Sequence, residues 1–331
     1  MTKRGPGKSF SRFEEFIAPG ADRFAILGVL LKEAALPFRV LPLEKSRHLF
    51  VHPDMESPAS DGKDPLSARN SLSTEHPLSS EHPPAAGDPL SSGSRAPKTV
   101  LVAHYDRAEG SPGANDNSAA VFMMIESAKK LLHEGEKNWG LIFTDHEEVP
   151  AGGSLEDQGS FALARFLRDR GFAASDFFIF DCCGTGDTLI ISTTAEHLLK
   201  EKEGEVSDRI RRAIHRQRAK VLETSRRLFM DKTLLAPTPF SDDPGFLQAG
   251  IAAQTITCLP ASEASALAQA LRLRPELLDH LLVNRKTEKN TTLPFFPPVW
   301  RRINGPGDQK QYLTPEYFNQ IEKLALALCR G

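Results

Sequence analysis

Short apolar segments alternate with amphipathic helices after Lys98, and this alternation restricts the fold more than any other feature of the chain. The expected strands cover 100–103, 139–144, 177–180, 188–192 and 251–258, and the expected helices cover 118–132, 160–170 and 314–330. Strands that are apolar throughout are buried on both faces, and strands that alternate with helices form largely parallel sheets. We therefore predict an α/β fold with a mixed, mostly parallel central sheet covered by helices on both faces.

The chain divides into two structured parts separated by a low-complexity segment. Residues 1–52 predict one helix over 21–35 and two short strands over 38–41 and 48–51, and we assign them to the same catalytic domain as the core at 98–331. Between them, residues 53–97 contain 8 prolines and 10 serines but no Val, Ile or aromatic residue. Such a composition cannot bury enough apolar area to offset the entropy lost on ordering, so we expect a disordered loop.

The charge and hydropathy of the chain exclude several classes of partner. A formal net charge of −2 gives no overall attraction to nucleic acid or to an anionic membrane. The basic segment 205–229 is expected to be a helix with its arginines in solvent, because apolar residues form a stripe along its other side. No signal peptide is evident, and no apolar run is long enough to cross a bilayer. We expect a cytoplasmic protein, and the oligomeric state is not indicated.

Acidic or imidazole side chains follow three of the expected strands and occupy one glycine-containing turn that leads into a helix. In chain order they are His104, Asp106, Asp116, Glu147, Glu148 and Asp181. Ligands bind at the carboxyl ends of the strands in parallel α/β sheets. We therefore predict that these side chains form one site.

The residue types and their spacing suit a metal site. Residues two apart in an extended chain share a face, so Asp106 can accept a hydrogen bond from one nitrogen of His104 and leave the other nitrogen for a metal. A carboxylate in a rigid turn, such as Asp116, can bridge two ions. Of the adjacent Glu147 and Glu148, one can bind the metal and the other can take a proton from metal-bound water. Asp181 ends an apolar strand, where a buried charge needs a partner.

Three segments, AHYDRAEGSPGANDNSAA, LIFTDHEE and FIFDCCGTGD, resemble the metal-binding segments of the zinc exopeptidase family, which includes bacterial leucyl aminopeptidases, glutamate carboxypeptidases and glutaminyl cyclases. The resemblance covers most of the chain from Val100 onward and implies a phosphorylase/hydrolase-like fold. It also implies that His104, Asp116 and Asp181 hold one zinc, that Asp116 and Glu148 belong to a second site, and that a cis peptide bond follows Asp116. The same resemblance assigns Glu147 as the general base and Asp106 as the residue that orients His104.

The chain departs from the family at the last metal ligand. The family has a histidine before the closing helix, four residues ahead of an aspartate, and spacing to Asp308 places Asn304 at that position. Matching Trp300 to the family instead places Arg301 there. An amide oxygen binds zinc much less well than an imidazole does. We therefore predict one firmly bound zinc, and a second ion, with Asn304 as its remaining candidate ligand, that is absent or weakly held.

The resemblance implies a zinc-dependent exopeptidase, aminopeptidase-like, that hydrolyses N-terminal peptide bonds with metal-activated water and takes peptides as substrates. Two alternatives stay open. The link Val149 to Gln158 is longer than the corresponding link in aminopeptidases, and in this it resembles glutaminyl cyclases. Its length favours a glutaminyl-peptide cyclotransferase. The missing histidine favours a catalytically impaired metal-binding protein, although a binding protein has no use for Glu147 as a base.

Overall fold

The computed structural model describes residues 12–43, 45–55, 90, 96–149, 154–282 and 296–330. Within these residues eight strands form one sheet in the order β1-β2-β4-β3-β5-β8-β6-β7. The strands are β1 (Phe38–Leu43), β2 (Ser46–Val51), β3 (Thr99–His104), β4 (Trp139–Thr144), β5 (Asp176–Phe180), β6 (Thr188–Ser192), β7 (Thr233–Ala236) and β8 (Ala253–Leu259). Parallel pairs join β3 to β4 and β5, β5 to β8, and β6 to β7, whereas β1–β2, β2–β4 and β6–β8 are antiparallel. The expected mixed, mostly parallel sheet is confirmed.

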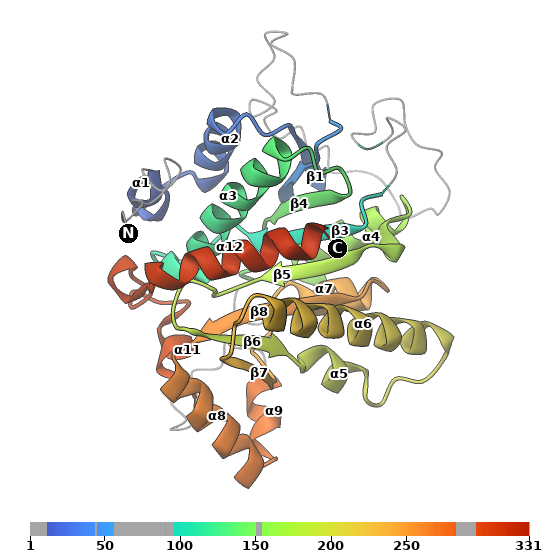
Figure 1. Ribbon diagram of the computed structural model, residues 1–331, viewed down its shortest axis with the longest axis vertical. Helices are drawn as coiled ribbons and strands as arrows, with labels where there is room; N and C mark the ends of the chain where they lie inside the picture. The colour runs from blue at the N-terminus through green and yellow to red at the C-terminus, as the bar shows by residue number, and fades with distance from the viewer. Residues whose placement is uncertain are drawn as a thin grey trace.

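Helices cover both faces of this sheet (Figure 1). On one face α1 (Phe13–Ile17), α2 (Arg23–Glu33), α3 (Ala119–His133) and α12 (Pro315–Arg330) bury apolar side chains against β3, β4 and β5. On the other face α4 (Gly159–Arg168) and α7 (Asp243–Gln248) pack on the alternate side chains of the same strands. The remaining helices are α5 (Thr194–Leu199), α6 (Glu205–Arg227), α8 (Ala261–Leu273), α9 (Leu277–Leu282) and α11 (Pro298–Arg302). No helix in the described part of the chain is long and apolar enough to cross a membrane.

The register of the parallel strands brings the ends of β3, β4 and β5 to one edge of the sheet. His104 pairs with Thr144, so β3 and β4 end together, and Val102 pairs with Ile179 on β5. Every residue of these three strands is buried. The side chains that follow the strands therefore emerge at one place, as expected for a parallel sheet.

Several elements, most of them short, are not among those predicted from the sequence. They are α1, α5, α7, α8, α9, α11 and β7. The helix α7 shows why, since its sequence DPGFLQ has a proline and a glycine in its first turn that weaken the helical signal. Proline is tolerated in the first turn because its missing N–H would have no partner there. Most of the segment 53–97 lies outside the described residues, so its expected disorder stays a prediction.

Candidate metal centre

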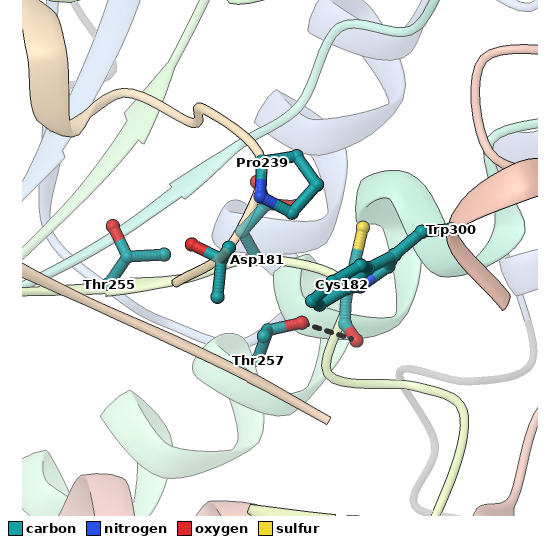
Figure 2. A pocket seen from close by; sticks show the side chains of 7 residues that line it. Asp181, Cys182, Pro239, Thr255, Thr257 and Trp300 are labelled. Carbon is teal, nitrogen blue, oxygen red and sulfur yellow. Dashed lines mark hydrogen bonds between the residues drawn. The ribbon is translucent and has the colours of Figure 1, made fainter. Parts of the chain in front are cut away.

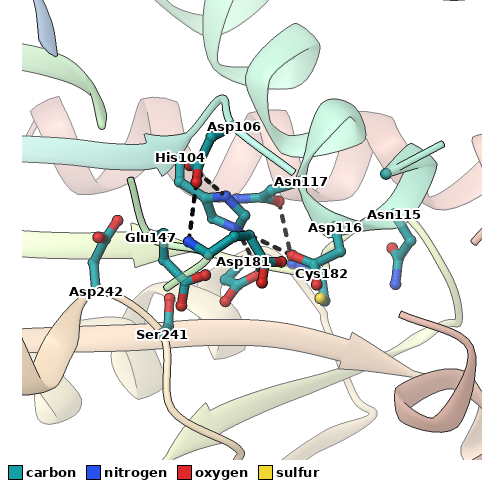
Figure 3. A network of polar contacts seen from close by, with 12 residues as sticks. His104, Asp106, Asn115, Asp116, Asn117, Glu147, Asp181, Cys182, Ser241 and Asp242 are labelled. Atoms are coloured by element: carbon teal, nitrogen blue, oxygen red, sulfur yellow. Dashed lines mark hydrogen bonds and ion pairs between the residues drawn. The ribbon is translucent and has the colours of Figure 1, made fainter. Parts of the chain in front are cut away.

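One histidine and two aspartates meet at the edge where β3 and β5 end. His104 is the last residue of β3, Asp181 follows β5, and Asp116 lies in the kinked segment Ala114–Ser118, where its own backbone is not helical. His104 Nε2 lies 3.0 Å from Asp116 Oδ1 and 3.6 Å from Asp181 Oδ1. The three side chains are buried, and they can each offer one ligand atom within 4.8 Å of the others. Figure 3 shows them converging on a common point.

The charges at this point fit a divalent cation. Burial lowers the pKa of His104, but hydrogen bonds with Asp106, Asp116 and Asp181 outweigh it and raise the pKa well above its ordinary value. The surrounding carboxylates therefore favour a positive charge at the centre of the cluster. An imidazole and two carboxylates are a donor set that zinc takes in three-ligand sites with an open fourth position. The residues present fit one such ion.

Asp106 connects His104 to the turn after β4. Its Oδ1 lies 3.4 Å from His104 Nδ1, and its Oδ2 accepts a hydrogen bond from the Glu148 backbone N–H at 2.9 Å. Burial raises the pKa of Asp106, but the hydrogen bond and charge of His104 lower it by more. A carboxylate in this position fixes the orientation of the imidazole and leaves Nε2 directed at the cluster.

The turn that carries Asp116 is held by side chains from two distant segments. Asp308 accepts hydrogen bonds from the backbone N–H groups of Asn115 and Asp116, both at 2.9 Å. The Asn117 amide donates to the Phe180 carbonyl at 2.8 Å and accepts from the Cys182 N–H at 3.2 Å. The Asp116–Asn117 peptide bond is cis, as the resemblance implies. These contacts set the position of Asp116 relative to Asp181, which lies between Phe180 and Cys182.

Glu147 and Glu148 occupy different surroundings. The Glu147 residue is 7% exposed, and its carboxylate interacts electrostatically with His104. Figure 3 includes it in the polar network of the cluster. Glu148 is half-buried, and its carboxylate lies against the Asn304 side chain. The structure therefore places one member of the acidic pair beside His104 and the other beside the candidate last ligand.

Of the two candidate replacements for the family histidine, the structure brings Asn304 to the site. With its nitrogen facing the carboxylates, the Asn304 amide donates to Asp116 Oδ2 at 3.1 Å and to Glu148 Oε2 at 3.0 Å, and it also contacts Glu148 Oε1. Arg301 is exposed, and its Nε donates to the Phe296 carbonyl at 2.8 Å.

Asp242 and Asp243 are buried outside the three-residue cluster. Thr144 Oγ1 donates to Asp242 Oδ2 at 2.6 Å, and the Ser241 N–H donates to Asp243 Oδ1 at 3.3 Å. Burial raises the pKa of Asp242 to about 6 and that of Asp243 to about 7. Both carboxyls therefore gain a proton more readily than an exposed aspartate does.

A pocket opens beside Asp181 (Figure 2). The space inside it is about 10 Å³, roughly the room that one water molecule needs. The lining residues are Asp181, Cys182, Thr238, Pro239, Thr255, Thr257 and Trp300. The Thr257 hydroxyl donates to the Cys182 carbonyl at 3.2 Å, which ties β8 to the turn after β5. Because Asp181 belongs to both the pocket and the cluster, a group in the pocket would lie next to the metal centre.

Arg23, the first residue of α2, holds the loop that carries Asp106 and Asp116, and it was not among the residues predicted from the sequence. Arg23 is 5% exposed, and burial lowers the pKa of its guanidinium to about 9. The guanidinium donates to six oxygens, namely the carbonyls of Phe16, Tyr105, Asp106, Pro112 and Gly113 and the hydroxyl of Ser118. An arginine at the start of a helix has no sequence feature that separates it from a surface cation.

We expect Arg23→Met to lower the free energy of unfolding by about 3 kcal/mol or more, because it leaves several buried carbonyls without a donor. Urea denaturation followed by circular dichroism measures the change. Lys32→Met, at an exposed position of the same helix, is the control and is expected to change stability by no more than about 0.5 kcal/mol. Equal effects of the two substitutions would contradict a structural role for Arg23.

Comparisons with known proteins agree with this architecture. The model of the family described as peptidase family M28 matches residues 90–327. No curated protein matches the chain. Among solved structures, a glutaminyl cyclase of Porphyromonas gingivalis is 14% identical with a TM-score of 0.59, and the alignment covers 97% of this chain and 96% of that one.

Two aminopeptidase structures are similar to a comparable extent. The leucine aminopeptidase precursor of Bacteroides thetaiotaomicron VPI-5482 is 13% identical with a TM-score of 0.57, covering 97% of this chain and 95% of that one. The LapA aminopeptidase of Legionella pneumophila is 12% identical with a TM-score of 0.56, covering 97% of this chain and 68% of that one. At these identities the likeness shows the shared fold and does not distinguish between the two activities.

Proposed function

This chain belongs to peptidase family M28, and from that membership we propose that it is a zinc-dependent aminopeptidase that removes residues from the N-termini of peptides. The observation that carries the proposal is the buried cluster of His104, Asp116 and Asp181 with the carboxylate of Glu147 beside it. These are the groups that metal-assisted hydrolysis of an amide needs, namely a metal site and an adjacent base.

In this proposal the three residues of the cluster hold the ion, and Asp106 keeps the His104 ring in the orientation that directs Nε2 at the cluster. A bound zinc ion supplies a Lewis acid that polarises the scissile carbonyl and lowers the pKa of water. Glu147 accepts the proton of the attacking water and returns it to the leaving amine. Because its surroundings exclude bulk water, Glu147 can keep that proton near the reacting bond.

Glutaminyl cyclisation is the weaker candidate. By the resemblance, the single zinc of that reaction is held at the positions of Asp116, Glu148 and Asn304. An amide at the third position is a poor zinc ligand. The cluster that contains an imidazole is the one around His104.

An assay that compares aminoacyl-anilides with N-terminal glutaminyl peptides, combined with metal analysis, tests the proposal. We expect release of the anilide that is abolished by a chelator and restored by zinc. Ammonia release from glutaminyl peptides without anilide cleavage would replace the proposal with the cyclase. Bound metal without turnover of either substrate would indicate a metal-binding protein that has lost activity.

A further inference from the structure

We propose that the side-chain amide of Asn304 takes the place of the second metal ion, so that Asp116 bridges one ion and one amide. The inference rests on the proposed metal centre at His104 for the first ion and concerns the residues of the second position. The donor set of that position is two carboxylates and an amide, without imidazole or thiolate, and it does not fit a tightly bound zinc.

The two carboxylate oxygens of Asp116 face different groups. Its Oδ1 lies 3.0 Å from His104 Nε2, on the side of the three-residue cluster. Its Oδ2 lies 3.1 Å from the Asn304 amide, and it accepts a hydrogen bond from that amide when the amide nitrogen faces it. The two oxygens of one carboxylate therefore face two different partners, as a carboxylate that bridges two ions would do.

The orientation of the amide follows from the charges around it. If its oxygen faced Asp116 and Glu148, an acceptor would point at two further acceptors. If its nitrogen faces them, each of the two N–H groups donates to one carboxylate. Hydrogen bonds to ionised acceptors are stronger than those between neutral groups. The N–H groups of the neutral amide therefore attract the two carboxylates, as a cation at this position would do.

The backbone presents Asn304 at this point. Helix α11 ends at Arg302, and Asn304 follows with φ of +63°. Asparagine, aspartate and histidine are enriched among the non-glycine residues that adopt this left-handed region. The same segment is anchored four residues later, where Asp308 binds the N–H groups of Asn115 and Asp116. Both His and Asp can therefore replace Asn304 with little backbone cost.

Counting zinc ions per chain tests the inference, by elemental analysis after dialysis and by titration calorimetry. We expect one equivalent in the wild-type protein and two in Asn304→His, because the imidazole restores a His–Asp–Glu set. Adding Glu148→Gln to Asn304→His is expected to return the count to one. Asn138→His, which adds an imidazole at an exposed position before β4, is the control for adventitious zinc and is expected to leave the count at one.

Each outcome bears on the inference separately from the proposed function. Two tight ions in the wild-type protein would overturn the inference and leave the enzyme proposal standing. No additional ion in Asn304→His would also overturn it. No ion in the wild-type protein with one in Asn304→His would support the amide assignment and remove the metal centre at His104 from the proposed function.

Asn304→Asp gives a second readout that does not depend on the histidine variant folding. It places a third carboxylate beside Asp116 and Glu148, where like charges repel. We expect a lower Tm than wild type without metal and a larger rise in Tm when zinc is added. An unchanged Tm without metal would show that the amide makes no contact with the two carboxylates and would overturn the inference.

Discussion

Glu147→Gln is expected to lower kcat by about a thousandfold while the bound zinc remains, within the range of about 10² to 10⁴ that general acid–base catalysis contributes. Glutamine has nearly the shape of glutamate but cannot accept the proton of the attacking water. Glu147 lies beside the cluster of His104, Asp116 and Asp181 and is not one of its members. Steady-state kinetics on an aminoacyl-anilide, with elemental analysis of the same preparation, measure both quantities.

Glu109→Gln is the matched control, since Glu109 is exposed in the loop between β3 and α3. It is expected to keep wild-type kcat and metal content. If Glu147→Gln lost metal together with activity, Glu147 would be a ligand, and the roles of Glu147 and Glu148 would have to be exchanged.

His104→Ala is expected to weaken zinc binding by more than about 100-fold, because it removes the one imidazole of the cluster. Asp106→Asn is expected to weaken it by about 10- to 100-fold, the cost of losing a partner that orients a ligand. Competition with a fluorescent zinc chelator measures both affinities. The order of the two effects tests the assignment of one residue as ligand and the other as its support.

His133→Ala removes an exposed histidine at the end of α3 and is expected to leave zinc affinity unchanged. If Asp106→Asn weakened binding more than His104→Ala does, Asp106 would be the ligand and the geometry at His104 would need another explanation. If neither substitution changed the affinity, the zinc would lie elsewhere in the chain.

The strand ends illustrate how much of the site could be predicted from local sequence. The expected strand over 139–144 has the bounds of β4, and the expected strand over 177–180 differs from β5 by one residue. An apolar strand that ends in His or Asp carries its own signal, because burial and charge change within one or two positions. Parallel pairing then brings the ends of such strands together without further information.

The residues that hold the Asp116 segment in place, Arg23 and Asp308, could not be predicted in the same way. Arg23 binds carbonyls 82 to 90 positions away, and Asp308 binds N–H groups 192 and 193 positions away. Arginine and aspartate in polar segments are usually solvated, and nothing near them in the sequence marks these two as buried. Only the packing of α2 and of the segment before α12 onto the Asp116 turn makes them structural.

The residue at the position of the family histidine also shows what the sequence determined and what the tertiary structure decided. By sequence alone, the chain specified a mostly parallel α/β sheet and the charged residues at its strand ends, because hydrophobic periodicity and strand termini are local properties. It placed either Asn304 or Arg301 at the position of the family histidine, since one matched the spacing to Asp308 and the other followed Trp300, and only Asn304 was expected to be a ligand. The tertiary structure decided between them, because the backbone turn after α11 directs the Asn304 amide at Asp116 and Glu148 while the exposed Arg301 donates to the Phe296 carbonyl.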